Sequence, residues 1–566
     1  MSEAVSVATP GVRRLSRLRA RVRAAAPARI ETALAVTSAV LLIFSFPDFN
    51  LWPLAWIALI PLFLAVVRRP QAASSFLLGW ITGTVFFFGS CYWLTYAMVR
   101  YGHIPVWIAY PLLVPGAMVV GFFPALCCLL LARLVVRWGT IAILLAPLFW
   151  AALEWARLGV TGQLWNATGY SQAYVTPLIQ SASWGGVYSV SFLIVAVNAA
   201  ISYALIKRNG RAVLLSLLIS MGVAGVIIAS NSFSASSTPP ATTQPDVVVI
   251  AVQPNVPMEP VEDLAVTEAL VNRHRGLSTN ALNGWEREGR LDNRSAGKPD
   301  GNQSQEGAQR VRQTITRLVI WPESPMNFTY ANDAAMREWV ARFAVENRTA
   351  VIFNSLELAP AGGAYNSAVM VNEEGRKVAQ YDKIRLLPFG EYVPLPRWLP
   401  GVSIVPVMVG DFTPGAEYPL MQVGQGTRVG VFICFESAFP SISREFANRG
   451  ADVLINISND GYLGPTPVMR QHLANTVFRA VENGRPVVRV TNTGISAYIT
   501  PRGEVVGATE GFKPEVRVWA INHTQDGKTF YTKFGDLFVA CCAAISFLLL
   551  VLAYKDYFMK FKSSRV

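Results

Sequence analysis

Long apolar segments constrain this chain more than any other feature of its sequence. Seven segments of roughly 20 apolar residues, long enough to cross a bilayer as helices, precede position 232, and an eighth lies near the C-terminus. We place them near residues 31–46, 52–68, 74–98, 105–135, 138–156, 183–206, 212–231 and 534–554. With 52% hydrophobic residues, the chain is too apolar for an ordinary soluble protein. The sequence therefore predicts a polytopic α-helical membrane domain with eight spans.

Lysine and arginine residues indicate how these spans are oriented. They gather in an arm at residues 1–30, in alternate loops between the spans, and in the tail after the last span. By the positive-inside rule these parts are cytoplasmic, so both termini lie inside and the long region 232–533 faces outward. The formal net charge of +13 belongs to this membrane topology, which argues against a nucleic-acid partner.

Region 232–533 differs in character from the apolar segments. It opens with a Ser/Thr/Pro-rich linker and then alternates short β-branched runs with helical patterns such as Asp333–Glu346 and Val468–Asn483. Such alternation predicts an α/β domain with helices covering a sheet. The expected strands are Val247–Val252, Leu318–Trp321, Ala350–Ser355, Ser367–Val371, Val429–Ile433, Val453–Ile457, Val487–Val490 and Ala497–Thr500. Residues 276–309 are polar and low in complexity, and we expect them to form a flexible insertion.

One cysteine is set apart from the other five. Cys434 follows an apolar strand-like run in the α/β region, whereas the others lie in the apolar segments. No CxxC spacing occurs, so neither a zinc site nor a disulfide framework is indicated. A cysteine where a strand gives way to a helix is well placed to act as a nucleophile. The alternative is that Cys434 is a small packing residue.

Acidic and basic residues follow two other strand-like runs. Glu323 lies in LVIWPESP, while Lys383 and Glu391 lie in QYDKIRLLPFGEYVP. A thiol nucleophile needs a base for its proton, and acyl transfer needs a cation or N–H groups for the oxyanion. Taken singly, a glutamate after a strand is usually a helix cap or a surface residue, and a lysine is usually solvated.

The short motifs around Glu323, Lys383 and Cys434 resemble those of a known family. WPES, YDKIRLLPFGEYVP, ICFES, ISNDGYLG and RAVENGRPVVRVTNTGISAYITPRG resemble the apolipoprotein N-acyltransferase family of the nitrilase superfamily. The segments FSFPDFNLWPLAWIALIPLF and GQLWNATGYSQ extend the resemblance into the apolar half. The resemblance implies eight spans, with an α/β nitrilase-like sandwich domain (232–533) between the seven-span domain (31–231) and the last span and tail (534–566).

The same resemblance implies roles for particular residues. Cys434 would be the acyl-accepting nucleophile, Glu323 the general base, and Lys383 a cation that stabilises the oxyanion. Glu391 would be an additional carboxylate beside Lys383. The pocket would be lined by Glu436 and by Phe435, where many members of the family have tyrosine.

Further residues are candidates for substrate contacts. Trp165, Tyr170 and Phe389 would guide acyl chains, although Trp and Tyr populate membrane interfaces in any case. Asn459 and Tyr462 would contact substrate. The Gly461–Tyr462 pair stands where a Thr-Trp pair is frequent in the family, and the loop that follows, at 465–467, is also altered. Among the four histidines, only His472 lies near the expected site, and their spacing suits neither a metal site nor a Cys–His pair.

The resemblance implies a two-step reaction. A fatty acyl chain would pass from a membrane phospholipid to Cys434 as a thioester, and then to the N-terminal amine of a diacylglyceryl-cysteine apolipoprotein, completing lipoprotein maturation. No cofactor or metal is expected. We expect a monomer in the bacterial inner membrane, with the catalytic domain in the periplasm.

Two other functions compete with this interpretation. A membrane-anchored amidase or nitrilase would use the same three groups to hydrolyse a small amide, but a simple anchor needs one span rather than seven. A transporter or sensor would only bind a ligand in its outer domain. No buried ionisable pair of the kind that marks an ion pathway stands out, and Glu154 is the nearest candidate.

Overall fold

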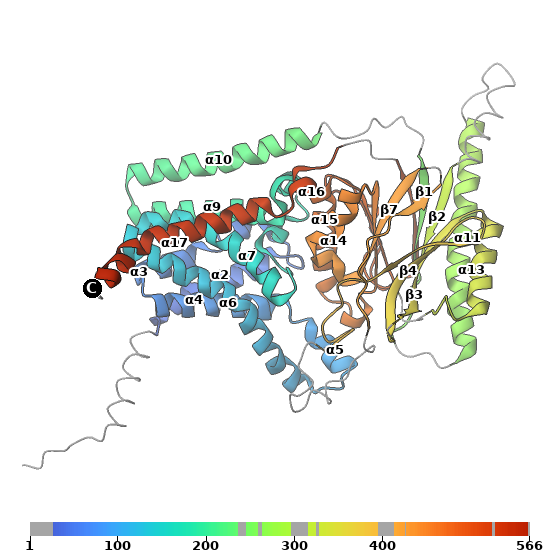
Figure 1. Cartoon of the computed structure of the whole chain (residues 1–566), viewed down its shortest axis with the longest axis horizontal. Helices are drawn as coiled ribbons and strands as arrows, with labels where there is room; N and C mark the ends of the chain where they lie inside the picture. The colour runs from blue at the N-terminus through green and yellow to red at the C-terminus, as the bar shows by residue number, and fades with distance from the viewer. Residues whose placement is uncertain are drawn as a thin grey trace, which may run out of the picture.

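The protein consists of a bundle of helices and an α/β domain, which lie side by side in the computed structural model (Figure 1). The structure describes residues 26–235, 245–258, 263–295, 315–323, 328–360, 362–393, 412–424, 426–522 and 527–563. Most of the predicted basic arm, most of the linker and residues 296–309 of the predicted insertion lie outside these ranges.

The helical bundle contains most of the apolar segments. Its elements are α2 (Arg29–Ser45), η1 (Trp52–Trp56), α3 (Ile60–Arg68), α4 (Ala72–Ser90), α5 (Leu94–Arg100), α6 (Val106–Trp138), η2 (Thr140–Leu145), α7 (Ala146–Thr161), η3 (Thr168–Gln172), α8 (Thr176–Ile179), α9 (Ala182–Lys207), α10 (Gly210–Ala235), α16 (Phe530–Phe534) and α17 (Leu537–Ser563). Within the described residues, 6 helices are long and apolar enough to cross a membrane: α4, α6, η2 with α7, α9, α10 and α17. The predicted count of eight is therefore not confirmed, because the other two segments form α2, of 17 residues, and the unit Trp52–Arg68, both short of the length counted as a span.

The predicted span 74–98 is wrong over residues 91–98, because the chain turns after Ser90 and restarts as α5. The Ser90 carbonyl at the end of α4 accepts hydrogen bonds from Trp93 Nε1 at 3.1 Å and from Gln471 Nε2 at 2.9 Å. The last carbonyls of a helix have no partner within the helix. Side chains, one of them from the α/β domain, thus complete the end of this helix.

The α/β domain has four layers, helix–sheet–sheet–helix. One sheet has the strand order β12-β1-β2-β3-β4-β5 and the other β11-β10-β9-β8-β7-β6. The strands are β1 (Val247–Gln253), β2 (Thr316–Ile320), β3 (Ala350–Leu358), β4 (Ala364–Val371), β5 (Lys377–Asp382), β6 (Met421–Val423), β7 (Thr427–Ile433), β8 (Val453–Ser458), β9 (Val487–Thr491), β10 (Ala497–Ile499), β11 (Val505–Val506) and β12 (Glu515–Ile521). Apolar side chains from both sheets share one core, to which Val249, Ile320, Val431 and Ile455 contribute.

Helices cover both outer faces of this sandwich. The first sheet is covered by α11 (Leu264–Ser295) and α13 (Ala334–Asn347), and the second by α14 (Pro440–Arg449) and α15 (Val468–Asn483). In Figure 1, α14 and α15 lie between the sheets and the helical bundle, whereas α11 and α13 lie on the far side. The bundle therefore packs against one helical layer of the α/β domain.

The expectation of a flexible insertion at 276–309 is wrong over its first part. Helix α11 continues through residues 276–295, and Leu282 is buried against the same core as Val340 of α13. Ser278 accepts a hydrogen bond from Trp321 Nε1 at 3.0 Å. The apolar face of this helix is sparse and interrupted by charged residues, so the composition of the segment concealed it.

Candidate active site

Three strand ends bring the predicted catalytic residues to one end of the sandwich. Glu323 follows β2, Lys383 follows β5, and Cys434 follows β7 and begins η5 (Cys434–Ala438). Strands β2 and β3 are parallel, and β4 is antiparallel to both β3 and β5. Strands β2 and β5 consequently run in the same direction, and their carboxyl ends meet at the same edge of the sheet.

Lys383 lies between two carboxylates. Its Nζ is 2.8 Å from Glu391 Oε1 and 3.8 Å from Glu323 Oε1, and its side chain is 1% exposed. Burial lowers the pKa of Lys383, but the charges of Glu391 and Glu323 outweigh burial, so that the net pKa is raised. The ammonium is therefore permanently charged within the site.

Asn366 on β4 holds the two carboxylates in place. Its Nδ2 donates to Glu323 Oε1 at 2.9 Å and to Glu391 Oε1 at 2.7 Å. Its Oδ1 accepts from Asn354 Nδ2 on β3 at 2.8 Å. The second oxygen of Glu391 accepts from the backbone N–H of Leu387 at 2.7 Å. These bonds leave Glu323 as the less enclosed carboxylate, with 15% of its side chain exposed.

Cys434 and Glu323 lie close enough to influence each other's pKa. Burial, the largest cause, raises the pKa of Glu323, whereas Lys383 and the Cys434 side chain lower it. Burial likewise raises the pKa of the Cys434 thiol; the Glu323 charge raises it further, and the Lys383 charge opposes the shift. The resting group is thus a neutral thiol near a carboxylate, an arrangement in which a base can accept the thiol proton as the sulfur attacks.

Glu436 is turned into the protein rather than toward the thiol. It is fully buried, and its oxygens accept from Tyr381 Oη at 2.8 Å and from the backbone N–H groups of Ile384, Arg385 and Ile433 at 2.8, 3.0 and 2.7 Å. Because Ile384 follows Lys383, these bonds fasten the start of η5 to the segment that carries the lysine. Glu436 is a positioning residue in this geometry.

An aromatic residue of the helical bundle covers the residue after the nucleophile. The rings of Trp165 and Phe435 stack with centroids 5.9 Å apart and an interplanar angle of 16°. Trp165 Nε1 donates to Gln471 Oε1 at 2.8 Å, and Trp93 Nε1 donates to the same oxygen at 3.1 Å. Gln471 thus ties two tryptophans of the bundle to α15 of the α/β domain.

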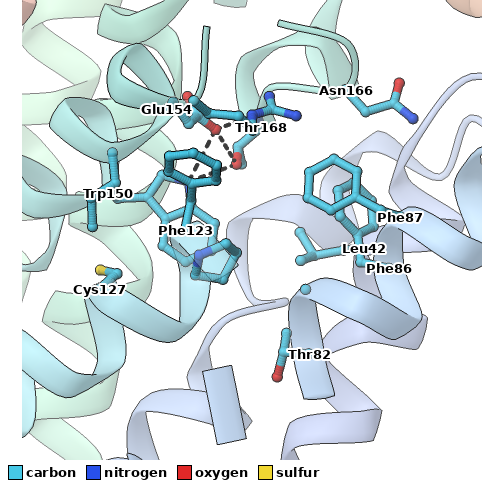
Figure 2. A pocket seen from close by; sticks show the side chains of 14 residues that line it. Leu42, Thr82, Phe86, Phe87, Phe123, Cys127, Trp150, Glu154, Asn166 and Thr168 are labelled. Carbon is cyan, nitrogen blue, oxygen red and sulfur yellow. Dashed lines mark hydrogen bonds between the residues drawn. The ribbon is translucent and has the colours of Figure 1, made fainter. Parts of the chain in front are cut away.

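Two side chains of the bundle hold the segment that carries Trp165. Glu154 Oε1 accepts from the N–H and Oγ1 of Thr168 at 2.7 and 2.9 Å, and from Trp150 Nε1 at 3.1 Å. Arg157 Nη1 donates to the Trp165 carbonyl at 2.7 Å. Figure 2 shows these contacts of Glu154 beside an apolar cavity between the helices. Glu154, named above as the nearest candidate for a buried ionisable group of an ion pathway, is thus an anchor for this segment.

The remaining predicted residues are dispersed. Burial raises the pKa of Tyr462, and the Glu323 charge raises it further. Its ring also meets Tyr101 of the bundle, with centroids 5.8 Å apart. Tyr170 instead accepts a hydrogen bond from Arg479 at 3.1 Å, at the junction of the two parts. Phe389 is 46% exposed, and Asn459 accepts from Gly461 and Asn492.

Comparison with known proteins accounts for nearly the whole chain. Residues 38–200 match the profile described as the apolipoprotein N-acyltransferase N-terminal domain, and residues 281–525 match that of the carbon-nitrogen hydrolases. The protein named apolipoprotein N-acyltransferase in Geobacter metallireducens is 32% identical over 535 residues, which cover 93% of this chain and 96% of that one. The chain belongs to the apolipoprotein N-acyltransferase family. A relative of the same name in Rhizobium meliloti is 30% identical over 85% of this chain and 87% of its own.

Family membership and the apolar helices together make this an integral membrane protein with a nitrilase-like α/β domain. Solved structures similar to that domain include an amidase from Nesterenkonia sp.. It is 20% identical, the match covers 50% of this chain and 94% of the amidase, and the TM-score is 0.33. At that level of similarity the family assignment depends on the sequence relatives alone.

Two features of the site, a buried asparagine and a buried ion pair, were not predicted from the sequence. Asn366 is one of three buried asparagines in the strands, with Asn354 and Asn456, and a buried polar residue inside a strand is the signal that was available. Asp460 and Arg489 form a buried pair at 2.8 Å behind Cys434, and their separation in sequence gave no sign of it. Within the described ranges, no group of three or more His, Cys, Asp or Glu residues could hold a metal ion.

Proposed function

We propose that this protein transfers a fatty acyl chain from a membrane phospholipid, through a thioester on Cys434, to the N-terminal amine of a diacylglyceryl-cysteine apolipoprotein. The observation that carries the proposal is that Glu323 and Lys383, whose Oε1 and Nζ atoms are 3.8 Å apart, both lie near enough to Cys434 for their charges to act on its thiol, in a chain whose relatives are named apolipoprotein N-acyltransferase.

In the first step, the Cys434 sulfur attacks the ester carbonyl of the phospholipid while Glu323 accepts the thiol proton. The C–S bond forms, and the carbonyl oxygen becomes an oxyanion beside the Lys383 ammonium and local N–H groups. The oxyanion then collapses, the ester C–O bond breaks, and Glu323 returns the proton to the departing lyso-phospholipid. The acyl chain is left as a thioester.

In the second step, the amine of the lipoprotein attacks the thioester carbonyl and gives a proton to Glu323. The C–S bond breaks, the thiolate takes the proton back from Glu323, and an amide is released. Splitting the transfer at a covalent intermediate replaces one difficult step by two easier ones, and it predicts ping-pong kinetics.

The membrane bundle accounts for the class of substrate. Moving each CH₂ group of an acyl chain into water costs about 0.8 kcal/mol, so a site for two lipid substrates belongs beside the bilayer. The stack of Trp165 on Phe435 supports a site that adjoins the bundle. We further propose eight spans, with α2 and the η1–α3 unit as the two shorter ones, both termini cytoplasmic, and the α/β domain in the periplasm of the inner membrane.

Mass spectrometry of the intact protein tests the proposal. After incubation with phosphatidylethanolamine of one defined acyl chain, we expect the mass of one acyl group to be added at Cys434. When a diacylglyceryl-cysteine peptide is added next, the protein should lose the mass of the acyl group, and the peptide should gain the same mass. The Cys434→Ala variant should show no adduct, whereas Cys127→Ala, a buried cysteine of the bundle, should react like the wild type.

Other outcomes distinguish the competing functions. An adduct that is lost only to water, with no acylated peptide, would indicate a hydrolase. Full lipoprotein acylation by the Cys434→Ala variant would rule out the thioester.

A further inference from the structure

A histidine lies directly behind the nucleophile, outside the groups that the proposed reaction uses. His472 is near the start of α15 and is 4% exposed. Its Nε2 is 2.9 Å from the backbone carbonyl oxygen of Cys434, and its Nδ1 is 2.8 Å from Asp460 Oδ1. Both ring nitrogens therefore face oxygen atoms.

The hydrogen bonds fix the protons on this ring. A carbonyl oxygen can only accept, so Nε2 carries a hydrogen. Asp460 receives two contacts from Arg489 Nη2, at 2.8 and 3.2 Å, and one from Ser458 Oγ at 3.2 Å. Burial raises the pKa of Asp460, but Arg489 and His472 outweigh burial and hold it well below its usual range. Asp460 is thus a carboxylate, and the proton between the two side chains belongs to Nδ1.

Other influences on the ring oppose one another. Burial, the largest influence, and the Arg489 charge lower the pKa of His472, and they outweigh Asp460 and the two hydrogen bonds, so that the net pKa is lowered. A neutral ring would have to direct a lone pair at one of the two oxygens, which costs a buried hydrogen bond. The two acceptor oxygens therefore favour the imidazolium, against the direction in which burial shifts the pKa.

This contact matters because of the conformation of Cys434. Its φ of 51° lies in the left-handed region, which costs a residue with a side chain about 1–2 kcal/mol and persists only where the surroundings impose it. The hydrogen bond from His472 at 2.9 Å, the shorter of two to this oxygen, fixes the direction of the Cys434 carbonyl; Asn456 Nδ2 lies 3.5 Å away. Since the peptide group is planar and trans, fixing that carbonyl also fixes the N–H of Phe435, which points the opposite way.

We propose that His472, held as an imidazolium by Asp460, is a positioning residue that orients the Cys434–Phe435 peptide so that the Phe435 N–H serves the oxyanion. The inference rests on the acyl-transfer chemistry proposed above, but it requires only an ester and a thiol, whatever the natural substrates are. The charged groups that face the ring are Asp460, after β8, and Arg489, on β9. Trp165 covers the ring from the bundle, with centroids 5.6 Å apart.

Two chemical probes of Cys434 separate this role from a merely structural one. Alkylation by iodoacetamide displaces iodide and forms no oxyanion, whereas acylation by p-nitrophenyl butyrate passes through one. In His472→Ala we expect acylation to slow by about 100-fold, the effect of losing one oxyanion donor, while alkylation stays within about 3-fold of the wild type. His472→Gln keeps an N–H donor and should recover much of the acylation rate.

Asn475→Ala serves as a matched control. Asn475 lies on α15, is equally buried, and has an Nδ2 with no partner among the described residues, so both rates should be unchanged. Equal losses in both probes for His472→Ala, or no loss in either, would overturn the proposal. If the wild type reacts with the probes but transfers no acyl group from phospholipid to amine, the proposed function fails and the inference stands.

The charge on the ring has a separate test. Solid-state ¹⁵N NMR of protein labelled on its four histidines, in bilayers at pH 7.5, should show both nitrogens of His472 protonated, with the resonances assigned by their absence from His472→Gln. An unprotonated Nδ1 would show that the ring is neutral and would overturn the inference that His472 is an imidazolium.

Discussion

Two charged neighbours act on the Cys434 thiol in opposite directions. Burial is the main reason that its pKa is raised; the Glu323 carboxylate raises it further, and the Lys383 ammonium lowers it. A raised pKa keeps the sulfur protonated until a base removes the proton, and only the thiolate is strongly nucleophilic. The site therefore separates two tasks: Glu323 accepts the proton, and Lys383 stabilises negative charge.

We predict opposite shifts for substitutions of these two neighbours. Lys383→Met should raise the thiol pKa and slow alkylation of Cys434 by iodoacetamide at pH 8 by about tenfold, because the lost cation stabilised the thiolate. Glu323→Gln should lower the thiol pKa and displace the alkylation profile toward lower pH, even though acyl transfer is lost. Peptide mass spectrometry after timed alkylation from pH 6 to 10 measures both effects.

A control substitution is available on the same domain. Glu374 is exposed, with 53% of its side chain accessible, and Glu374→Gln should leave the profile unchanged. Shifts of the same sign in both site variants would mean that the packing of the site, rather than charge, controls the sulfur.

At the scale of helices, α4 and α6 approach each other through small residues. A Cβ on Gly79 would lie 2.4 Å from the carbonyl oxygen of Pro124, and one on Gly83 would lie 2.7 Å from the Cα of Gly121. Small residues let membrane helices pack closely, where dispersion contacts replace the missing hydrophobic driving force. The close packing of α4 against α6 fixes the position of α4. The last turn of α4, at Ser90, accepts a hydrogen bond from Gln471 of the α/β domain.

Gly79→Ala should therefore destabilise the protein, by roughly 1–3 kcal/mol, because the added methyl group meets backbone and forces the helices apart. Gly116→Ala is the matched control, since a Cβ at Gly116 on α6 meets no atom within 4 Å. Thermal unfolding in lipid nanodiscs, followed by tryptophan fluorescence, compares the two variants. Equal midpoints would show that the helices can separate at no cost.

The elements that the sequence predicted best are those with a strong local pattern. Strands β1, β7, β8 and β9 are built mainly of apolar residues, and each was placed to within two residues of its observed ends. Strand β5 is half-exposed and β11 has two residues, so neither shows the clear pattern of apolar residues that marks a strand in a sequence. Helix α11 was mistaken for a flexible insertion because its polar composition hides a narrow apolar face.

The candidate site was predictable in part for the same reason. Cys434, Glu323 and Lys383 each follow a recognisable run, so their roles could be proposed from the sequence. Asn366 and His472 act through contacts with residues 43 and 38 positions away. Such contacts depend on how the strands and helices pair in three dimensions, which no local pattern specifies.

At the scale of the whole molecule, α15 lies on the side of the α/β domain that faces the bundle (Figure 1), and a buried charged cluster on this helix joins the two parts. Glu482 on α15 accepts from Arg479 Nη2 at 2.9 Å and from the N–H of Val187 at 3.0 Å. That N–H is available because α9 is kinked at Gly185 and Gly186. Arg479 also donates to Tyr170 of the bundle, so this cluster and Gln471 hold α15 at both ends.

Glu482 should make the stability of this junction depend on pH. Burial raises its pKa from 4.5 to about 7, although Arg479 opposes the shift. Between these values the folded protein keeps a proton that the unfolded chain has released, so stability falls as pH rises through this window. A shift of this size corresponds to roughly 3 kcal/mol, and Glu482→Gln, which cannot ionise, should remove the dependence.

The measurement is the difference in unfolding free energy between Glu482→Gln and the wild type at pH 4.5 and at pH 8. We expect that difference to move by roughly 3 kcal/mol in favour of the variant at the higher pH. Glu338→Gln controls for general charge effects, since Glu338 is exposed on α13, and its difference should not change with pH. If the difference for Glu482→Gln is constant as well, Glu482 is already ionised at pH 4.5. In that case the Arg479 charge outweighs burial in setting the pKa of Glu482, and an ion pair joins the membrane bundle to the α/β domain.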